Sequence, residues 1–538
     1  MALLPITKIA ETAGIPEEYV IPFGKYKAKI DYSLYETLKD KPNGKLVLVT
    51  AITPTKAGEG KTTTSIALTE GMAKIGQKAL LCLREPSLGP VFGIKGGATG
   101  GGLASVAPSQ DINLHFTGDM HALTSSINLI AAIIDNHIYQ GNALRIDPER
   151  VVWKRAMDMN DRALRNVTVA QGDPKGSPRE DHFVITVASE LMAILCLAKD
   201  EQDFRDRVNN ILVAYDLDGA PIYLRQLRIS NAIMSLMKDA LLPNLVQTLE
   251  NNPVLIHGGP FANIAHGCNS LLATQLALKM SPIVITEAGF AADLGAEKFL
   301  DIKCRVGGLH PDCAVLVATI RALKMHGGQA FEELTQKNLE CLDKGFDNLV
   351  AHYENLTLYG LPVVVAINHF ASDDEEEVAL LRKRCEEKGY PVAFLDGFLQ
   401  GGEGSTELAK KVVETLETKP SNYAAIYDLN ASIKDKIETI CTKIYHAGKV
   451  EYSEKALAQI AEYEALGYGD AYVCIAKTPQ SLTDDPKVLG APRGFTISIR
   501  EVNLSAGARF VIPLTGAILT MPGLPKVPAA VKMEDNPA

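Results

Sequence analysis

A glycine-rich segment lies between an apolar run and a helical pattern near the start of the chain, and it constrains the fold more than any other feature. Residues 45–50 (KLVLVT) form a short apolar run typical of a buried strand. Residues 64–73 have helical spacing with no breaker at their start. Residues 53–63, with the sequence TPTKAGEGKTT, join the two. A strand, a glycine-rich loop ending in Gly-Lys-Thr and a helix together predict a phosphate-binding loop.

The chemistry of this loop suits the phosphates of a nucleotide. Glycines let backbone N–H groups converge on phosphate oxygens, and the helix N-terminus adds favourable partial charge. Lys61 would reach the outer phosphates, and the Thr62 hydroxyl would hold magnesium. The predicted nucleotide-binding residues are Thr55, Lys56, Ala57, Gly58, Glu59, Gly60, Lys61, Thr62 and Thr63. The alternative is a glycine-rich turn with a surface lysine, since Thr55 stands where such loops usually have their first glycine.

Length and composition limit the classes of protein that this chain can belong to. A chain of 538 residues exceeds a single compact core, so we expect two to four domains. The formal net charge of −10 argues against a nucleic-acid or anionic-membrane partner. Nine cysteines without a C-x-x-C pair suit a reducing compartment, and the N-terminus lacks the layout of a secretion signal. The longest apolar run, 185–198, is too short to span a bilayer and predicts a buried helix. We therefore expect a cytoplasmic protein.

Apolar runs alternate with helical patterns along much of the chain, which predicts an α/β fold. The runs are 45–50, 78–83, 254–257, 282–286, 314–318 and 362–367, followed near the C-terminus by 496–499 and 510–513. Short Val/Ile-rich strands of this kind predict a mostly parallel sheet covered by helices on both faces. Changes of pattern predict three parts: a nucleotide-binding and catalytic domain at 1–350 and two smaller α/β domains at 351–445 and 446–538.

Ligands of such sheets bind beyond the carboxyl ends of the strands, and this rule selects candidate site residues. The residues that follow the predicted strands are Arg84, Glu85, His257, Gly258, Gly259, Glu287, Arg321, Asn368, His369 and Phe370. An arginine at a strand end can hold a small carboxylate or phosphate through two parallel hydrogen bonds. The other reading of Arg84, as the partner in a structural salt bridge, is equally open at this point.

A second glycine-rich loop spans residues 93–102 and contains six glycines. It cannot form a stable helix, because each glycine costs about 1 kcal/mol relative to alanine. One reading is a flexible surface loop. The other is close approach of the backbone to an anionic ligand, with Lys95, Gly96 and Gly97 forming the anion-binding part.

The sequence resembles the formate–tetrahydrofolate ligase (formyltetrahydrofolate synthetase) family over almost its whole length. The strings that carry the resemblance are TPTKAGEGKTT at 53–63, REPSLGP at 84–90, DMNDRALR at 158–165, HGGPFANIAHGCN at 257–269, TEAGF at 286–290, VATIRALKMHGG at 317–328 and MPGLP at 521–525. The sequence departs from the family pattern at Lys56, usually Pro, at His369, usually Arg, and at Phe398, usually Trp. In the second glycine-rich loop, Leu103 replaces a Tyr.

The resemblance implies an enzyme of one-carbon metabolism. In this family ATP phosphorylates formate to formyl phosphate, and the 10-position amine of tetrahydrofolate attacks its carbonyl to give 10-formyltetrahydrofolate, ADP and phosphate. Lys61, the loop amides and magnesium suit the first step, and Arg84 suits formate or the acyl phosphate. The resemblance also implies activation by potassium or ammonium and a homotetramer.

The resemblance assigns further residues to tetrahydrofolate. Phe370 and Phe398 would sandwich the pterin, with Phe290 and Phe394 nearby, because flat rings stack on one another. Asp119 is a candidate carboxylate near the reacting centre.

Two alternatives belong to other classes of protein. A partition-type regulatory ATPase is favoured by Lys56 alone. A non-catalytic paralogue that binds folate or nucleotide is disfavoured by the presence of both Lys61 and Arg84.

Overall fold

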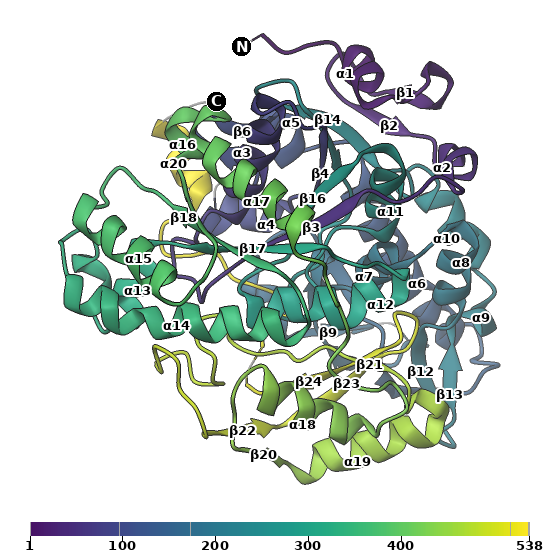
Figure 1. Cartoon of the computed structure of the whole chain (residues 1–538). Coiled ribbons are helices and arrows are strands. Elements are labelled where there is room, and N and C mark those ends of the chain that lie inside the picture. The colour runs from purple at the N-terminus through teal and green to yellow at the C-terminus, as the bar shows by residue number, and fades with distance from the viewer. Residues whose placement is uncertain (1, 96, 173, 517, 536–538) are drawn as a thin grey trace.

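The computed structural model describes residues 2–95, 97–172, 174–516 and 518–535. A large twisted sheet runs through the middle of the molecule, with helices on both of its faces and a smaller C-terminal part below it (Figure 1). The fold is α/β with a mixed, mostly parallel sheet, as the sequence predicts.

Ten strands follow one another across this sheet. In spatial order they are β1 (Val20–Pro22), β2 (Ala28–Ile30), β14 (Asn244–Thr248), β15 (Pro253–Ile256), β4 (Ala79–Leu83), β16 (Ile283–Glu287), β3 (Lys45–Ala51), β17 (Cys313–Ala318), β18 (Val363–Asn368) and β19 (Val392–Leu395). All pairings from β15 to β19 are parallel, whereas β1, β2 and β14 pair antiparallel. The hairpin of β5 (Gly100–Gly101) and β6 (Ala104–Ala107) joins the sheet at β14. The six predicted strands of this sheet are confirmed.

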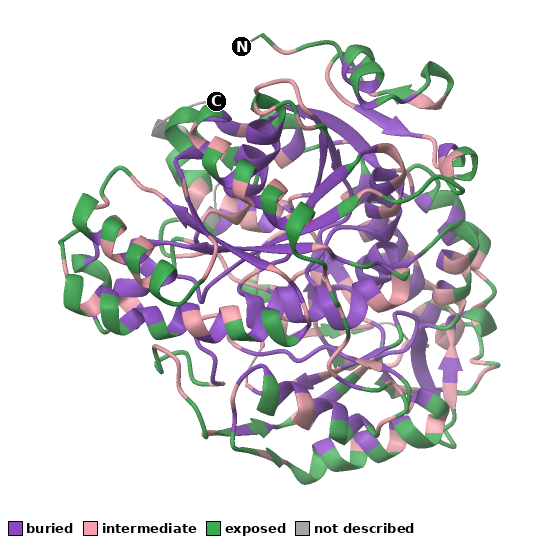
Figure 2. Ribbon diagram, in the orientation of Figure 1, coloured by how far each residue is buried: buried purple, intermediate pink, exposed green. Residues whose placement is uncertain are grey.

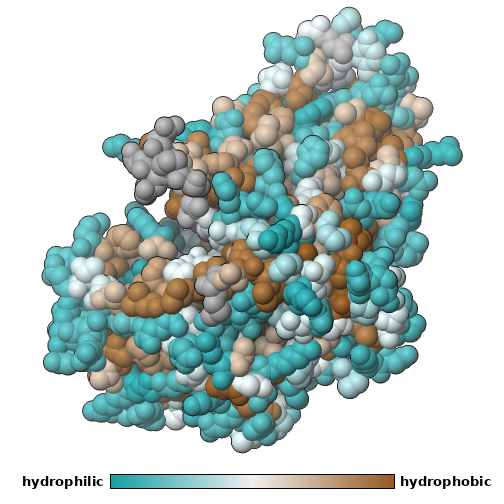
Figure 3. All heavy atoms as spheres, turned by 90° about the horizontal axis from the view of Figure 1, so that it is seen from above, coloured by the Kyte–Doolittle hydropathy of each residue, from teal (hydrophilic) through white to brown (hydrophobic). Residues whose placement is uncertain are grey.

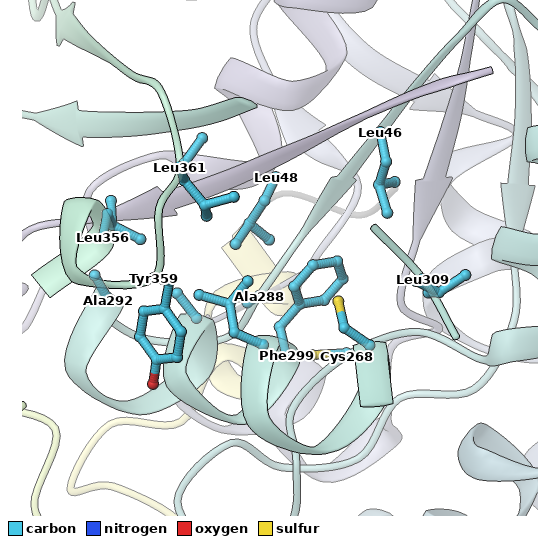
Figure 4. Packing of buried hydrophobic residues seen from close by; sticks show 14 of the residues in the cluster. Leu46, Leu48, Cys268, Ala288, Ala292, Phe299, Leu309, Leu356, Tyr359 and Leu361 are labelled. Carbon is cyan, nitrogen blue, oxygen red and sulfur yellow. The ribbon is translucent and has the colours of Figure 1, made fainter. Parts of the chain in front are cut away.

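Helices bury both faces of the parallel strands, which explains why these strands read as continuous apolar runs. Leu46 and Leu48 of β3 belong to one apolar cluster with Phe299 and Tyr359 (Figure 4). Val47 and Val49 of the same strand belong to a second cluster on the opposite face. Figure 2 shows the central strands almost wholly buried, with exposed residues on the outer sides of the helices.

The helices that cover the sheet come from distant parts of the chain. On one face lie α3 (Lys61–Lys74), α16 (Gly397–Gln400) and α17 (Thr406–Thr418). On the other lie α11 (Leu271–Met280), α13 (Ile320–His326), α14 (Leu339–Leu358) and α15 (Glu375–Glu387). Since α3 directly follows β3, the first glycine-rich loop lies at the carboxyl end of a central strand, as the sequence predicts.

Residues beyond the main sheet form smaller layers. One apolar cluster contains α6 (Asp119–Tyr139), α7 (Glu190–Leu197), α8 (Glu201–Asn209), α9 (Leu224–Leu227) and α10 (Ser230–Met237), beside the sheet β13 (Pro221–Tyr223), β12 (Leu212–Asp216) and β7 (Ile146–Val151). Two-stranded pairs are β8 (Arg155–Met157) with β11 (Phe183–Ile185), and β9 (Val167–Val169) with β10 (Arg179–Asp181). Within the run 185–198, α7 is the predicted buried helix, and the residues before it form a 3₁₀ turn.

The C-terminal part has two small sheets of its own. They are β20 (Lys449–Tyr452) with β22 (Thr496–Ile499), and β21 (Tyr472–Val473), β24 (Phe510–Leu514) and β23 (Glu501–Ser505), packed with α18 (Ile433–Lys443) and α19 (Glu454–Tyr463). The remaining helices are α1 (Ile6–Ala13), α2 (Ser33–Leu38), α4 (Leu88–Pro90), α5 (Ser109–Asn113), α12 (Cys304–Gly307) and α20 (Ala529–Asp535). The main sheet continues across residue 350, because β18 pairs with β17 over five residues. The proposed boundaries at 350 and 445 stay predictions.

The described helices include no candidate for a membrane-spanning segment. Among the described residues, no helix combines the length and the apolar character needed to cross a bilayer. Hydrophilic residues dominate the periphery of the face in Figure 3, with hydrophobic residues between them toward the middle.

A buried carboxyl lies where α3 meets the loop that follows α16. Glu70 of α3 is fully buried beside Glu250, and burial, with a smaller contribution from Glu250, raises the pKa of the Glu70 carboxyl to about 8. Glu250 accepts a hydrogen bond from the Gly402 N–H at 2.8 Å and pairs with Lys74 at 3.2 Å. Glu70 therefore stays protonated at neutral pH and becomes a second buried negative charge when the pH rises.

This arrangement predicts that the folded protein becomes less stable as the pH rises from about 4.5 to about 8. The folded-state pKa of Glu70 lies above its ordinary value of 4.5, so the folded protein binds the extra proton between about pH 4.5 and pH 8. Unfolding free energy should fall as pH rises through that window, by at most about 1.4 kcal/mol per pH unit for one group. Glu70→Gln should remove this slope and exceed wild type in stability at pH 8.5. Denaturant unfolding from pH 5 to pH 9 measures it; parallel curves for the two proteins would contradict the prediction.

Candidate active site

The first glycine-rich loop, residues 53–60, connects β3 to α3 in a conformation that requires glycine. Gly58 and Gly60 have φ values of 78° and 75°, in the left-handed region that other residues rarely adopt. A methyl group on Gly60 would lie 2.5 Å from the Asn368 amide nitrogen. The loop therefore passes close to the end of β18 and delivers Lys61 as the first residue of α3, where helix N–H groups lack intrahelical partners.

A buried carboxylate inside the loop fixes its shape. Glu59 accepts hydrogen bonds from the Thr55 N–H at 2.7 Å and from the Thr319 hydroxyl. Its own carbonyl accepts from the Asn368 amide at 3.0 Å. Thr319 follows β17 and Asn368 ends β18, so the middle of the loop is held against two neighbouring strand ends. Lys56 and Ala57 are exposed at its outer edge.

Glu287 joins the start of α3 to the end of β4. It is the last residue of β16, which lies between β3 and β4 in the sheet. Its carboxylate accepts a hydrogen bond from the Thr62 hydroxyl at 2.9 Å, and its other oxygen lies 3.7 Å from the Arg84 guanidinium. Thr62 and Arg84 therefore lie on two sides of one buried carboxylate. The structure thus brings together the predicted magnesium ligand and the predicted anion-binding arginine.

Arg84 keeps capacity to bind a further anion. Its ion pair with Glu287 is long, and its single recorded hydrogen bond in the described structure, to the Pro260 carbonyl, is 3.5 Å. Its Nε is buried and has no partner within the described residues. Since the guanidinium is always charged and presents donors in a planar fork, a small carboxylate or phosphate is a suitable ligand for it.

Two buried lysines add positive charge beneath Arg84. Lys298 donates to the Ala262 carbonyl at 2.5 Å, and Lys303 donates to the Asn269 and Thr274 side chains at 2.9 Å. No carboxylate in the described parts of the chain forms an ion pair with either. Burial and the charges of Lys303, Lys298 and Arg84 together hold the pKa of His266 well below its usual range. Burial also lowers the pKa of Lys303. Three cationic side chains, Arg84, Lys298 and Lys303, thus lie near His266.

Asp119, a predicted catalytic carboxylate, is the first residue of α6 and is almost completely buried. It pairs with Lys29 at 2.7 Å and accepts from the Asn244 amide at 2.8 Å. Burial, with a smaller contribution from the neighbouring Asp119 carboxylate, raises the pKa of the Glu85 carboxyl well above its usual range and so favours its protonated form. Glu85 follows Arg84 directly, and Asp119 therefore contacts the predicted site through Glu85.

The second glycine-rich loop packs against Phe398. The Leu103 N–H donates to the Phe398 carbonyl at 2.9 Å, and Gly102 lies so close to that carbonyl that a methyl group there would overlap it. A methyl group on Gly101 would lie 3.0 Å from the Phe398 ring. Phe398 is half exposed. The glycines of this loop thus allow close approach to the loop that carries a predicted folate residue.

The anion-binding part assigned to this loop is only partly described. Gly96 lies outside the described residues, and the side chain of Lys95 is likewise not described. Gly97 lies near Asn113, which accepts a hydrogen bond from the next residue, Ala98, at 2.9 Å.

The other predicted folate residues lie at strand ends. Phe370 follows β18, and the Arg321 guanidinium lies over its ring at 3.8 Å. Phe394 lies in β19, with its ring 5.2 Å from that of His369. Phe290 follows Gly289, which lies against Arg84, and has a φ of 56° that is unusual for a side chain of its size. Their assignment to tetrahydrofolate stays a prediction.

Several site residues lacked an assigned role at the level of sequence. The strand-end rule selected Glu287, Arg321 and Asn368, but not their contacts. Lys298 and Lys303 had no signal at all, because buried lysines have no sequence pattern of their own.

These features define an α/β protein with a glycine-rich loop and a group of cationic side chains at the carboxyl ends of adjacent parallel strands. Comparison with protein families agrees with this: the family model described as formate–tetrahydrofolate ligase matches residues 1–537. The chain therefore belongs to the formate–tetrahydrofolate ligase family, whose enzymes act on formate, ATP and tetrahydrofolate.

Removal of the buried positive charge of Lys303 should weaken the binding of formate without lowering the stability of the fold. Lys303→Met keeps the length of the side chain and removes its charge. The requirement for formate should rise roughly tenfold, since unit charges about 10 Å apart interact by about 1.7 kcal/mol at an effective dielectric constant of about 20. The melting temperature should stay equal or rise, because an uncompensated buried charge is removed.

The measurement is the formate KM together with a thermal melt. Lys436→Met is the matched control, because Lys436 is also buried and donates only to the Gly469 and Ala471 carbonyls, far along the chain in the C-terminal part. Its formate KM should not change. An unchanged formate KM in Lys303→Met would refute the electrostatic role.

Proposed function

We propose that this protein ligates formate to tetrahydrofolate through a formyl phosphate intermediate, with ATP as the phosphoryl donor. The observation that carries the proposal is the position of Glu287 between Thr62 and Arg84. A nucleotide held by the first glycine-rich loop and a carboxylate held by Arg84 would then approach the same point from the ends of β3 and β4, the two strands on either side of β16. Phosphoryl transfer mainly requires such positioning, together with neutralisation of charge.

In the first step, an oxygen of formate attacks the terminal phosphorus of ATP, and the bond between that phosphorus and ADP breaks. Lys61 and the backbone N–H groups at the start of α3 would bind the phosphates. Arg84 would orient formate, and Lys298 and Lys303 would favour the anionic reactants over water. In the second step, the folate amine attacks the formyl carbon, the bond from that carbon to the phosphate oxygen breaks, and the leaving phosphate takes up the proton of the amine.

The residues around Thr62 fit a magnesium ion. The Thr62 hydroxyl and the Glu287 carboxylate are oxygen donors 2.9 Å apart, and magnesium prefers oxygen ligands. Bound with the nucleotide, the ion would neutralise negative charge on the phosphates. We propose Thr62 and Glu287 as the residues that hold it.

The folate would bind on the side of β18 and β19. Phe370 and Phe398 would stack on the pterin, with Phe290 and Phe394 completing the apolar surface. Asp119 would act by keeping Glu85 protonated beside Arg84, rather than by touching substrate. Activation by potassium or ammonium, assembly as a homotetramer and a cytoplasmic location belong to the same proposal and rest on the family.

The proposal predicts that ADP forms at steady state only when ATP, formate and tetrahydrofolate are all present. Omitting each in turn and measuring ADP tests this. Lys61→Ala and Arg84→Ala should each lower turnover at least 100-fold while the melting temperature changes little, since both groups act on charge in the transition state. Equal ADP formation without formate and folate would instead support a regulatory ATPase. Binding of both ligands without turnover would support a non-catalytic paralogue.

The magnesium assignment predicts a binding defect that needs no turnover. Calorimetry of ADP with and without magnesium should show tighter ADP binding with the ion in wild type. Glu287→Gln should lose most of that tightening, because a neutral amide is a weaker ligand for a divalent cation. Glu403→Gln, at an exposed carboxylate beside Lys74, is the control. A wild-type response to magnesium in Glu287→Gln would remove Glu287 from the site.

A further inference from the structure

Arg321 contacts both the first glycine-rich loop and the ring of Phe370. It is the second residue of α13, directly beyond the end of β17. In the plane of its guanidinium, an N–H donates to the Gly58 carbonyl, and Nε lies 3.8 Å from the Glu59 carboxylate. The central carbon of the same group, Cζ, lies over the Phe370 ring at 3.8 Å from its centre. One side chain therefore connects the predicted nucleotide loop with a predicted folate platform.

The surroundings keep both ends of this contact in place. Glu59 is buried and held by Thr55 and Thr319, so the loop cannot move away from Arg321 without breaking these bonds. The Phe370 N–H donates to the Asp373 carboxylate at 2.9 Å, which anchors the backbone beneath the ring. Arg321 thus covers one face of the Phe370 ring, and Phe370 is partly exposed.

The geometry requires a guanidinium. Its N–H groups lie in one plane and bind the loop, while the face of the same plane stacks on an aromatic ring. A lysine ammonium at this position would keep the charge, but it is a compact point donor and cannot do both. A shift of Gly58 when phosphate binds would therefore move the guanidinium and, through it, the ring.

We propose that Arg321 couples occupation of the nucleotide loop to the affinity of the Phe370 surface for the folate ring. This inference rests on the proposed function, because it takes ATP and tetrahydrofolate as the two ligands. Arg321 is then a positioning residue that touches neither reacting atom. The coupling is reciprocal: a nucleotide that tightens folate binding by some factor must itself be tightened by folate by the same factor.

A second arginine–phenylalanine stack in the chain supplies a matched control. The Arg384 guanidinium lies 5.5 Å from the centre of the Phe346 ring and pairs with Asp343 at 2.7 Å. Arg384 belongs to α15 and Phe346 to α14, and within the described residues no hydrogen bond or ion pair joins Arg384 to the first glycine-rich loop. Arg384→Lys therefore makes the same chemical change at a site with no predicted ligand.

The experiment measures the dissociation constant of tetrahydrofolate with and without a saturating non-hydrolysable ATP analogue and magnesium, in the absence of formate. The ratio of the two constants is the coupling factor. In wild type we expect a factor of at least about 5, within the usual range for coupled sites. In Arg321→Lys it should fall below about 2, and in Arg384→Lys it should equal that of wild type. The reverse titration, of analogue with and without tetrahydrofolate, must give the same factors.

The coupling factor separates coupling from a purely structural role. Loss of a purely structural residue would weaken the binding of one or both ligands but leave the ratio of the two tetrahydrofolate dissociation constants unchanged. If Arg321→Lys melts far below wild type, Phe370→Leu takes its place, because it keeps apolar volume and removes the flat ring; its factor should also fall below about 2. The inference would be overturned if the folded variant had the same coupling factor as the wild-type protein. It would also be overturned if the wild-type protein bound both ligands with a coupling factor of 1. Failure of wild type to bind tetrahydrofolate or the analogue would overturn the proposed function itself, and the inference with it.

Discussion

The parallel pairing of β16 between β3 and β4 is the constraint on which the candidate site depends. Five residue pairs join β16 to β3 and four join it to β4, so the three strands end at one edge of the sheet. Thr62 follows β3 by way of the loop, Glu287 ends β16 and Arg84 follows β4. A slip of one residue in either pairing would turn Glu287 to the opposite face and separate Thr62 from Arg84. The apolar clusters on both faces prevent that slip, because every second residue of β3 is committed to each face.

The charges around this edge are unequal. Glu287 is a buried carboxylate beside Arg84, whereas Lys298 and Lys303 form no ion pair with a carboxylate among the described residues. Burying charge without an ionic partner costs free energy, so this arrangement lowers the stability of the empty protein. Formate, phosphate and the intermediate between them are all anions, and each would return part of that cost on binding. A site with this charge balance would be more stable with anionic reactants bound than without them.

The sequence predicted the strands and the first glycine-rich loop because their signals are local. An apolar run, a Gly-Lys-Thr triplet and a helical pattern lie within about thirty residues of one another. It also selected Glu287 and Arg321, because they follow apolar runs. It did not predict what they touch, since that depends on which strands become neighbours: Glu287 meets Thr62, 225 positions earlier in the chain. Asp119 shows the same limit, because its partner Lys29 lies 90 positions away. The buried lysines 298 and 303 were missed because an isolated lysine in sequence usually indicates an exposed surface.

The two predicted folate rings are attached to the same nucleotide-binding elements by different means. Phe370 is connected through Arg321 to the first glycine-rich loop. Phe398 belongs to α16, which follows β19, and the N–H of Leu103, next to the second glycine-rich loop, donates to its carbonyl. After α16, Ser405 donates to the Ala67 carbonyl of α3. At this contact there is no room for a side chain at Gly71 of α3 or at Gly397, so the two segments are closely packed. A change in the position of α3 would therefore reach both rings, one through a charged stack and the other through close backbone packing. The predicted folate surface is therefore supported by elements of the predicted nucleotide site.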